Sequence, residues 1–135
     1  YCLYLRNLHT IYAALERALV ARGDEPSLQP FSHPALFRSD ALARDLRRLA
    51  GDEWAALSVL PSAGAYADTL RRLSTTQPAL LGAHAYVRYL GDLSGGRMVR
   101  SCVASALAID GDETAEGLAF YAFDTPPGAL ARQLR

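Results

Sequence analysis

The sequence predicts an all-α, single-domain protein, and three observations support this prediction. Apolar residues recur three and four positions apart over most of the chain, a spacing that places them on one face of a helix. Only one compact apolar block, residues 117–123, is ambiguous between strand and helix. The length of 135 residues suits one domain, and no internal repeat divides the chain. We therefore expect residues 1–135 to form one helical bundle.

The composition is that of an ordinary globular domain, with 50% hydrophobic and 21% charged residues. The 14 basic side chains, all arginine, balance 14 acidic ones, so no overall field indicates nucleic acid or a membrane as partner. No apolar run has the length of a membrane span, and no signal peptide is visible. Cys2 and Cys102 have no metal-binding spacing, so we expect no structural zinc and a reducing cytoplasm as the location.

The first predicted helix ends near Gly23, because glycine commonly follows a helix. Its buried face is expected to consist of Leu5, Leu8, Ile11, Tyr12, Leu15 and Leu19. Residues 23–34 contain prolines and are predicted as a loop, with Pro34 opening a short turn of helix. Ser39 is the expected N-cap of a second helix, which ends at Gly51.

Two further helices are predicted beyond this point. A short helical piece is expected around Trp54, and Ser62 precedes a third helix. Thr76 and Pro78 mark the cap and first turn of a long fourth helix that runs to about Ile109. The expected inward residues are Leu42, Leu46 and Leu49 of the second helix and Tyr66, Leu70 and Leu73 of the third.

The C-terminal part of the sequence is less regular. Residues 111–116 are polar and are predicted to form a loop. The apolar block at 117–123 is expected to pack as a helical or irregular segment, because nothing else in the chain resembles a strand. Prolines and a glycine at 126–128 then break the chain before a last helical start.

The long fourth helix contains three glycines within six residues, each of which costs about 1 kcal/mol relative to alanine in a helix. Gly91 and Gly95 share one face, and Gly96 lies beside it. A face without side chains lets another body approach the helix backbone closely, and the glycines allow a kink. The alternative is a C-cap and turn here, with Asp92 or Ser94 capping a second helix.

The residues around these glycines closely resemble the distal-helix signature of the heme oxygenases. The matching residues are Tyr86, Arg88, Tyr89 and Gly91 through Gly96. Other segments match in order and spacing, namely Leu8 to Glu16, Gln77 to Leu81 and Gly117 to Phe123, so the resemblance covers essentially the entire chain. It implies a bundle that holds heme between a proximal helix, which bears a histidine ligand, and a glycine-kinked distal helix. The family converts heme to biliverdin, carbon monoxide and ferrous iron, using O2 and electrons from a reductase or ferredoxin.

The resemblance also implies catalytic roles for three residues. Asp92 would anchor a network of ordered water, with Arg88 and Tyr12 as members. A carboxylate that acts through water delivers protons more gently than one in direct contact. From the residues alone, Asp92 and Arg88 could instead be a local pair four positions apart on a helix, and Tyr12 could be a core tyrosine.

Heme-binding roles follow in the same way. The residues implied are Gly91, Gly95, Gly96 and Ser94 on the distal helix, Tyr86 and Arg132 at the heme propionates, and Tyr121 on an aromatic wall. Arginine suits a propionate because its guanidinium binds a carboxylate with two hydrogen bonds. The alternatives are simple packing for Tyr86 and a solvated surface position for Arg132.

No histidine of the chain stands where the resemblance places the iron ligand. His33 is expected in a loop, His9 on a helix surface and His84 in structural packing. The sequence starts without methionine in a helical pattern and stops inside one. We therefore expect a fragment without the ligand helix and without the final helices, and we assign no metal ligand within it.

Three function classes remain open at this point. The first is an oxygenase that degrades heme. The second is a non-catalytic heme carrier or sensor on the same fold, which would keep Tyr86 and Arg132 but not need Asp92. The third is a helical interaction domain without a cofactor, in which the glycines serve close helix packing. The combination of Asp92, Arg88 and Gly91 favours the first class.

Overall fold

The computed structural model describes residues 1–109 and 116–134. These residues form helices and connecting turns without a strand, which confirms the all-α prediction for the described part of the chain. The α-helices are α1 (Cys2–Ala21), α2 (Ser39–Ala50), α3 (Pro61–Thr76), α4 (Leu80–Leu107) and α5 (Pro127–Gln133). The short 3₁₀ helices are η1 (Pro26–Phe31), η2 (Pro34–Leu36), η3 (Asp52–Ala56) and η4 (Ala119–Tyr121).

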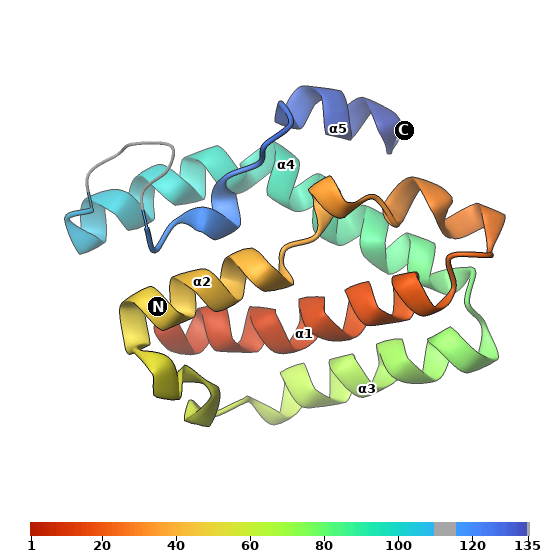
Figure 1. The fold of residues 1–135 in the computed structure, drawn as a ribbon, viewed down its shortest axis with the longest axis horizontal. Coiled ribbons are helices and arrows are strands. Elements are labelled where there is room, and N and C mark those ends of the chain that lie inside the picture. The colour runs from red at the N-terminus through yellow and green to blue at the C-terminus, as the bar shows by residue number, and fades with distance from the viewer. Residues whose placement is uncertain (110–115, 135) are drawn as a thin grey trace.

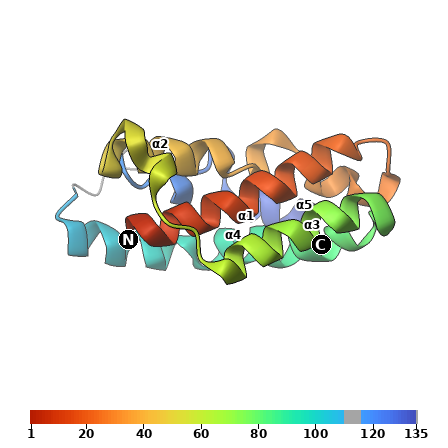
Figure 2. The same cartoon turned by 90° about the horizontal axis from the view of Figure 1, so that it is seen from below.

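Helix α1 lies at the centre of the bundle. Helices α2 and α3 pack along either side of it, and α4 crosses obliquely behind them (Figure 1). In the view of Figure 2, α4 runs along the opposite edge of the bundle from α2. All the apolar residues predicted to face inward from α1 are buried: Leu5, Leu8, Ile11, Tyr12, Leu15 and Leu19. The helical spacing of apolar residues therefore predicted the central part of the core correctly.

The start of α2 differs from the prediction. Ser39 is the first residue of the helix and Arg38 is the N-cap, with no capping bond from its own side chain. The acceptor comes from α1, where the Glu16 carboxylate accepts the N–H groups of Arg38 at 2.5 Å and of Ser39 at 3.2 Å, as well as the Ser39 hydroxyl. A carboxylate suits this position because the first N–H groups of a helix lack partners within it. Gly51 ends α2 as predicted, with φ at 79°, a conformation that glycine adopts easily.

Other boundaries also shift by a few residues. The predicted loop at 23–34 contains η1, whereas Pro34 does open the short helix η2. Helix α3 begins at Pro61, because proline at the first helical position loses no hydrogen bond. Its buried residues are Ala63, Ala67 and Leu70, while Tyr66 and Leu73 are half-buried. Thr76 ends α3 and does not cap α4, whose N-cap is Ala79.

Helix α4 continues through the glycines without a break. The structure therefore contradicts the alternative of a C-cap and turn at this position. The axis of α4 changes direction near its middle (Figure 1), as expected for a glycine-kinked helix. The helix ends at Leu107, before the predicted Ile109, and Ala108 follows with a positive φ of 51°. Most of the polar loop predicted at 111–116 lies outside the described residues, and the apolar block beyond it contains η4.

Candidate functional site

A hydrogen bond between α1 and α4 forms the centre of the candidate site. The hydroxyl of Tyr12 donates to Oδ2 of Asp92 at 2.5 Å, across 80 positions of sequence. Tyr12 is fully buried, and its ring packs against Tyr89 at a centroid distance of 6.2 Å and against Phe120 at 5.8 Å. These aromatic contacts fix the phenol, so the Asp92 carboxylate is held on the inner side of α4.

The surroundings of Asp92 bring its titration close to neutral pH. Burial raises the pKa of Asp92, whereas the hydrogen bond from Tyr12 and the positive charges of Arg38 and Arg88 lower it. The net pKa is about 6. Burial raises the pKa of Tyr12, and the negative charge of Asp92 raises it further. The phenol therefore remains protonated and donates the hydrogen bond. A carboxylate with this pKa is mostly ionised at pH 7 and still accepts protons readily.

Arg88 lies one turn before Asp92 but does not form the simple local pair. Within the described residues no ion pair joins them. The guanidinium of Arg88 instead lies 5.8 Å from the ring centroid of Tyr12 and 5.3 Å from that of Tyr66. Such positions favour a cation. Arg88 thus stabilises the ionised carboxylate through its field while it rests on two tyrosine rings.

Gly91 and Gly95 form an open strip on α4. A Cβ atom added at either position would meet no heavy atom within 4 Å. Along the same row of the helix lies Val87, which is 71% exposed, and beside the strip lies Met98, which is 76% exposed. A row of glycines bordered by exposed apolar side chains fits a flat, largely apolar body laid against the helix backbone.

Comparison with known proteins shows which family the chain resembles. The family model described as heme oxygenase matches residues 1–132. The chain belongs to the heme oxygenase family. It is 40% identical over 124 residues to a heme oxygenase 2 from Synechocystis, an alignment that covers 91% of this chain and 48% of that relative. The chain therefore spans about half the length of the curated relatives it matches.

Solved structures of the family share the fold. Heme oxygenase-1 from Synechocystis in complex with heme superposes with a TM-score of 0.89 at 32% identity, over 99% of this chain and 60% of that one. Heme oxygenase-2 from Synechocystis in complex with heme and NO has a TM-score of 0.87 at 36% identity, over 98% of this chain and 57% of that one. The all-α bundle of the heme oxygenase type is thereby confirmed.

The predicted propionate ligands lie at the surface. Tyr86 is 38% exposed on α4, and Arg132 is exposed on α5, the helix that packs against α4. Ser94, between the glycines in sequence, is also exposed. Within the described part of the chain these side chains form no hydrogen bond or ion pair, so their roles in this heme oxygenase family member stay predictions.

Gly96 and Tyr121 belong to a different face of α4 from the open strip. Gly96 is buried, and a Cβ added there would lie 3.7 Å from the ring of Tyr121. Tyr121 is buried and packs edge-on against Phe120 at 4.9 Å. The structure thus uses Gly96 for packing against η4, a role that the sequence pattern alone did not distinguish from that of Gly91 and Gly95.

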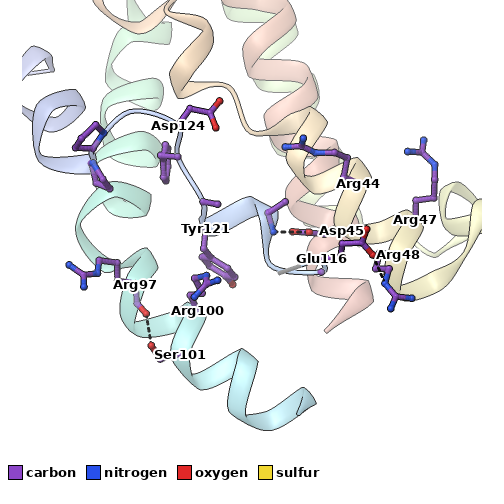
Figure 3. Close-up of a pocket in the computed structure, with 16 residues that line it drawn as sticks. Arg44, Asp45, Arg47, Arg48, Arg97, Arg100, Ser101, Glu116, Tyr121 and Asp124 are labelled. Carbon is purple, nitrogen blue, oxygen red and sulfur yellow. Dashed lines mark hydrogen bonds and ion pairs between the residues drawn. The ribbon is translucent and has the colours of Figure 1, made fainter. Parts of the chain in front are cut away.

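Tyr121 also borders a groove between α2 and α4, shown in Figure 3. The groove has a volume of about 1360 Å³ and contains five arginines: Arg44, Arg47, Arg48, Arg97 and Arg100. Two ion pairs moderate this charge, since Glu116 pairs with Arg48 at 2.9 Å and Asp52 with Arg47 at 3.7 Å. Neither Tyr12 nor Asp92 is among the residues that line this groove.

The three histidines occupy structural positions. Nδ1 of His84 lies 2.8 Å from the Tyr66 hydroxyl, which supports the expected packing role. His33 caps η2 by accepting the N–H of Ala35. His9 is half-buried with its ring 4.8 Å from Trp54, so it is less exposed than the predicted surface residue. No group of metal-binding side chains occurs among the described residues.

Sequence reasoning missed three buried charged residues, Glu16, Arg38 and Asp45. Asp45 has a recognisable signal, because it falls on the apolar row of α2 beside Leu42 and Leu46. Glu16 likewise follows the apolar row of α1. Arg38 lies outside the helices and has no periodic signal, yet its charge acts directly on Asp92.

Proposed function

We propose that this chain is part of a heme oxygenase that cleaves heme oxidatively to biliverdin, carbon monoxide and ferrous iron, with O2 and electrons from a reductase or ferredoxin. The observation that carries this proposal is the Tyr12–Asp92 hydrogen bond beside the open glycine strip. A heme carrier has no need of a half-buried carboxylate whose pKa is about 6 next to its binding face. Asp92 therefore favours the oxygenase over the carrier or sensor.

The residues of the chain suit the parts of this reaction that a protein performs. Heme and O2 supply the redox chemistry when bound. The strip at Gly91 and Gly95 would bring helix backbone against the flat ring, since no side chain stands between them. The exposed apolar residues beside the strip would exclude water from that side, and Tyr86 and Arg132 are proposed to bind the propionates.

Asp92 is proposed to hold and transfer protons through water. Tyr12 engages Oδ2, and no hydrogen bond from the described residues reaches Oδ1. Oδ1 can therefore accept from a water molecule, which a bonded carboxylate would orient. The positive charge of Arg88 keeps the carboxylate ionised between proton transfers.

A heme titration of the full-length protein, followed by a single turnover, tests the proposal. We expect one saturable heme site per chain, and biliverdin as product when ascorbate replaces the unknown electron donor. Absence of a saturable site would contradict heme binding altogether. Tight binding without biliverdin would instead identify a carrier or sensor.

No helix among the described residues combines the length and apolar character of a membrane span.

A further inference from the structure

Arg38 is a buried cation whose guanidinium forms no ion pair with a carboxylate among the described residues. It is 7% exposed, and its guanidinium donates to three backbone carbonyls: Leu36 at 3.2 Å, Ala35 at 3.1 Å and Ala122 at 2.6 Å. Its planar group also stacks 3.9 Å from the ring centroid of Phe123. A buried charge in such a position is costly unless other charges compensate for it.

The compensating charges are the carboxylates of Asp92, Glu16 and Asp124. Burial lowers the pKa of Arg38, and the field of Asp92 opposes that effect more strongly than the field of Glu16 does. The influence is mutual, because Arg38 precedes Arg88 among the charges that lower the pKa of Asp92. A cation fixed by three carbonyls and one ring cannot move away to solvent, so this field is a constant property of the site.

Arg38 also holds one end of the segment that packs on Tyr12. Asp45 accepts hydrogen bonds from the N–H groups of Ala119 and Phe120, both at 2.8 Å, at the start of η4. Figure 3 shows the Asp45 carboxylate with a dashed line to this segment. Arg38 binds the carbonyl of Ala122 at the other end. A negative charge at the N–H end and a positive charge at the carbonyl end both complement the backbone dipoles of the segment. The Phe120 ring between them contacts Tyr12.

We propose that Arg38 is a positioning residue for Asp92, which keeps the Asp92 carboxylate ionised and holds the 117–123 segment against its hydrogen-bond partner Tyr12. Asp45 can share only the second task, because it binds the same segment but carries a negative charge, which cannot favour the ionised form of Asp92. This inference rests on the proposed function only for its effect on catalysis. The effect on Asp92 itself requires no heme.

Several groups act on the titration of Asp92, and the test must separate them. Those from the elements packed around it are Tyr4, Tyr12 and Glu16 of α1, Arg38 before α2, Arg88 and Tyr89 of α4, and Tyr121 of η4. Of these, only Arg38 and Arg88 carry positive charge. Substitution of Arg38 at constant Arg88 therefore isolates the contribution of Arg38.

The experiment is an NMR titration that follows the resonance of the Asp92 carboxyl carbon in the full-length protein as pH changes. The resonance is assigned as the one that is missing from the spectrum of Asp92→Asn. In Arg38→Gln, which keeps an amide donor but no charge, we expect the pKa of Asp92 to rise by about one pH unit or more. Arg38→Lys keeps the charge and should restore most of the effect. The acid limb of the pH profile of heme degradation should move in parallel.

Asp45→Asn is the matched control. It should increase hydrogen exchange at Ala119 and Phe120, because it weakens their acceptor, and leave the pKa of Asp92 where it was. An unchanged pKa in Arg38→Gln, or an equal change in Asp45→Asn, would overturn the role of the Arg38 charge. These outcomes are independent of heme, so they are distinguishable from a failure of the proposed function.

If Arg38→Gln does not fold, an NMR measurement on the unsubstituted protein tests the same coupling between Arg38 and Asp92. The side-chain N–H resonance of Arg38 in the unsubstituted protein should show an inflection at the pKa of Asp92. That inflection should disappear in Asp92→Asn. A resonance that does not respond to pH in this range would contradict the coupling.

Discussion

At the residue scale, the carboxyl group of Asp92 experiences opposing influences. Burial favours its neutral form, whereas a hydrogen bond from Tyr12 and two arginines favour the anion. The balance places its pKa at about 6, well above the usual value of 3.8. A group poised in this range can exchange protons at neutral pH without large cost in either direction.

Asp92→Ala should separate heme binding from heme degradation. We expect heme affinity to remain nearly intact, because the proposed contact of the carboxylate is with water. Biliverdin formation in a single turnover should fall by about 10²- to 10⁴-fold, or roughly 3–5 kcal/mol of barrier. Asp92→Asn should be intermediate, since its amide oxygen can still accept from Tyr12. Undiminished biliverdin from Asp92→Ala would remove Asp92 from the mechanism.

The raised pKa of Asp92 also predicts how stability depends on pH. The folded state binds this proton more tightly than the unfolded state, so the stabilising contribution is complete below about pH 4 and is lost as pH rises through about 6. The free energy of unfolding should therefore decrease over this interval, by at most about 3 kcal/mol from Asp92. Urea denaturation at a series of pH values measures it. Asp92→Asn should flatten the dependence, and an identical slope in both proteins would contradict the assignment.

At the scale of the element, α4 sacrifices helix stability for an open face. Gly91 and Gly95 leave space above the backbone, whereas Gly96 permits close packing of Tyr121. Glycine in a helix interior costs about 1 kcal/mol relative to alanine. The helix persists because its other side is buried along most of its length, through Leu81, Ala85, Tyr89, Leu93 and Ala104.

Gly91→Ala and Gly95→Ala should raise stability and impair function together. Each added methyl group has open space and improves helix propensity, so the free energy of unfolding of the heme-free protein should increase by up to about 1 kcal/mol. Heme affinity or turnover should fall, because the methyl group stands where the flat ring is proposed to lie. Thermal unfolding and heme titration measure the two effects.

Gly64→Ala in α3 provides the control for this pair. Gly64 also lies inside a helix with nothing within 4 Å of an added Cβ. It should show the same gain in stability with heme binding unaltered. Equal heme binding in all three variants would show that the strip on α4 does not contact heme.

At the scale of the whole molecule, large apolar side chains are exposed on both α4 and α1. Val87, Met98 and Val99 of α4 and Leu3 and Tyr4 of α1 are all exposed. An apolar surface of this kind beside a glycine row is expected to be covered when heme binds. Burial of the surface should then contribute to affinity and stabilise the folded protein by mass action.

Val87→Gln tests this larger surface. Val87 is 71% exposed, so the substitution should change the free energy of unfolding of the heme-free protein by no more than about 0.5 kcal/mol. Heme affinity should decrease measurably, because a polar group would enter the proposed contact. Leu60→Gln is the control, since Leu60 is similarly exposed but precedes α3. A similar loss of affinity in both variants would point to a general effect of surface polarity.

The sequence by itself determined the helical class, the main helices and the string of residues around Asp92. These features follow from local rules: apolar spacing defines a helix, glycine ends α2 at Gly51, and proline opens η2 at Pro34. The difference between Gly96 and the two open glycines was not accessible in this way, because it depends on Tyr121, a residue far along the chain.

Only the tertiary structure decided which charges meet. Glu16 caps α2 from another helix, Asp45 binds the start of η4, and Arg38 reaches both Ala122 and the field of Asp92. Each of these contacts joins residues that are more than twenty positions apart, and local propensity contains no information about such pairs. They form because packing of α1, α2 and α4 buries polar groups that then require partners. The ionisation of Asp92 is therefore a property of the bundle, although the residue itself was evident from the sequence.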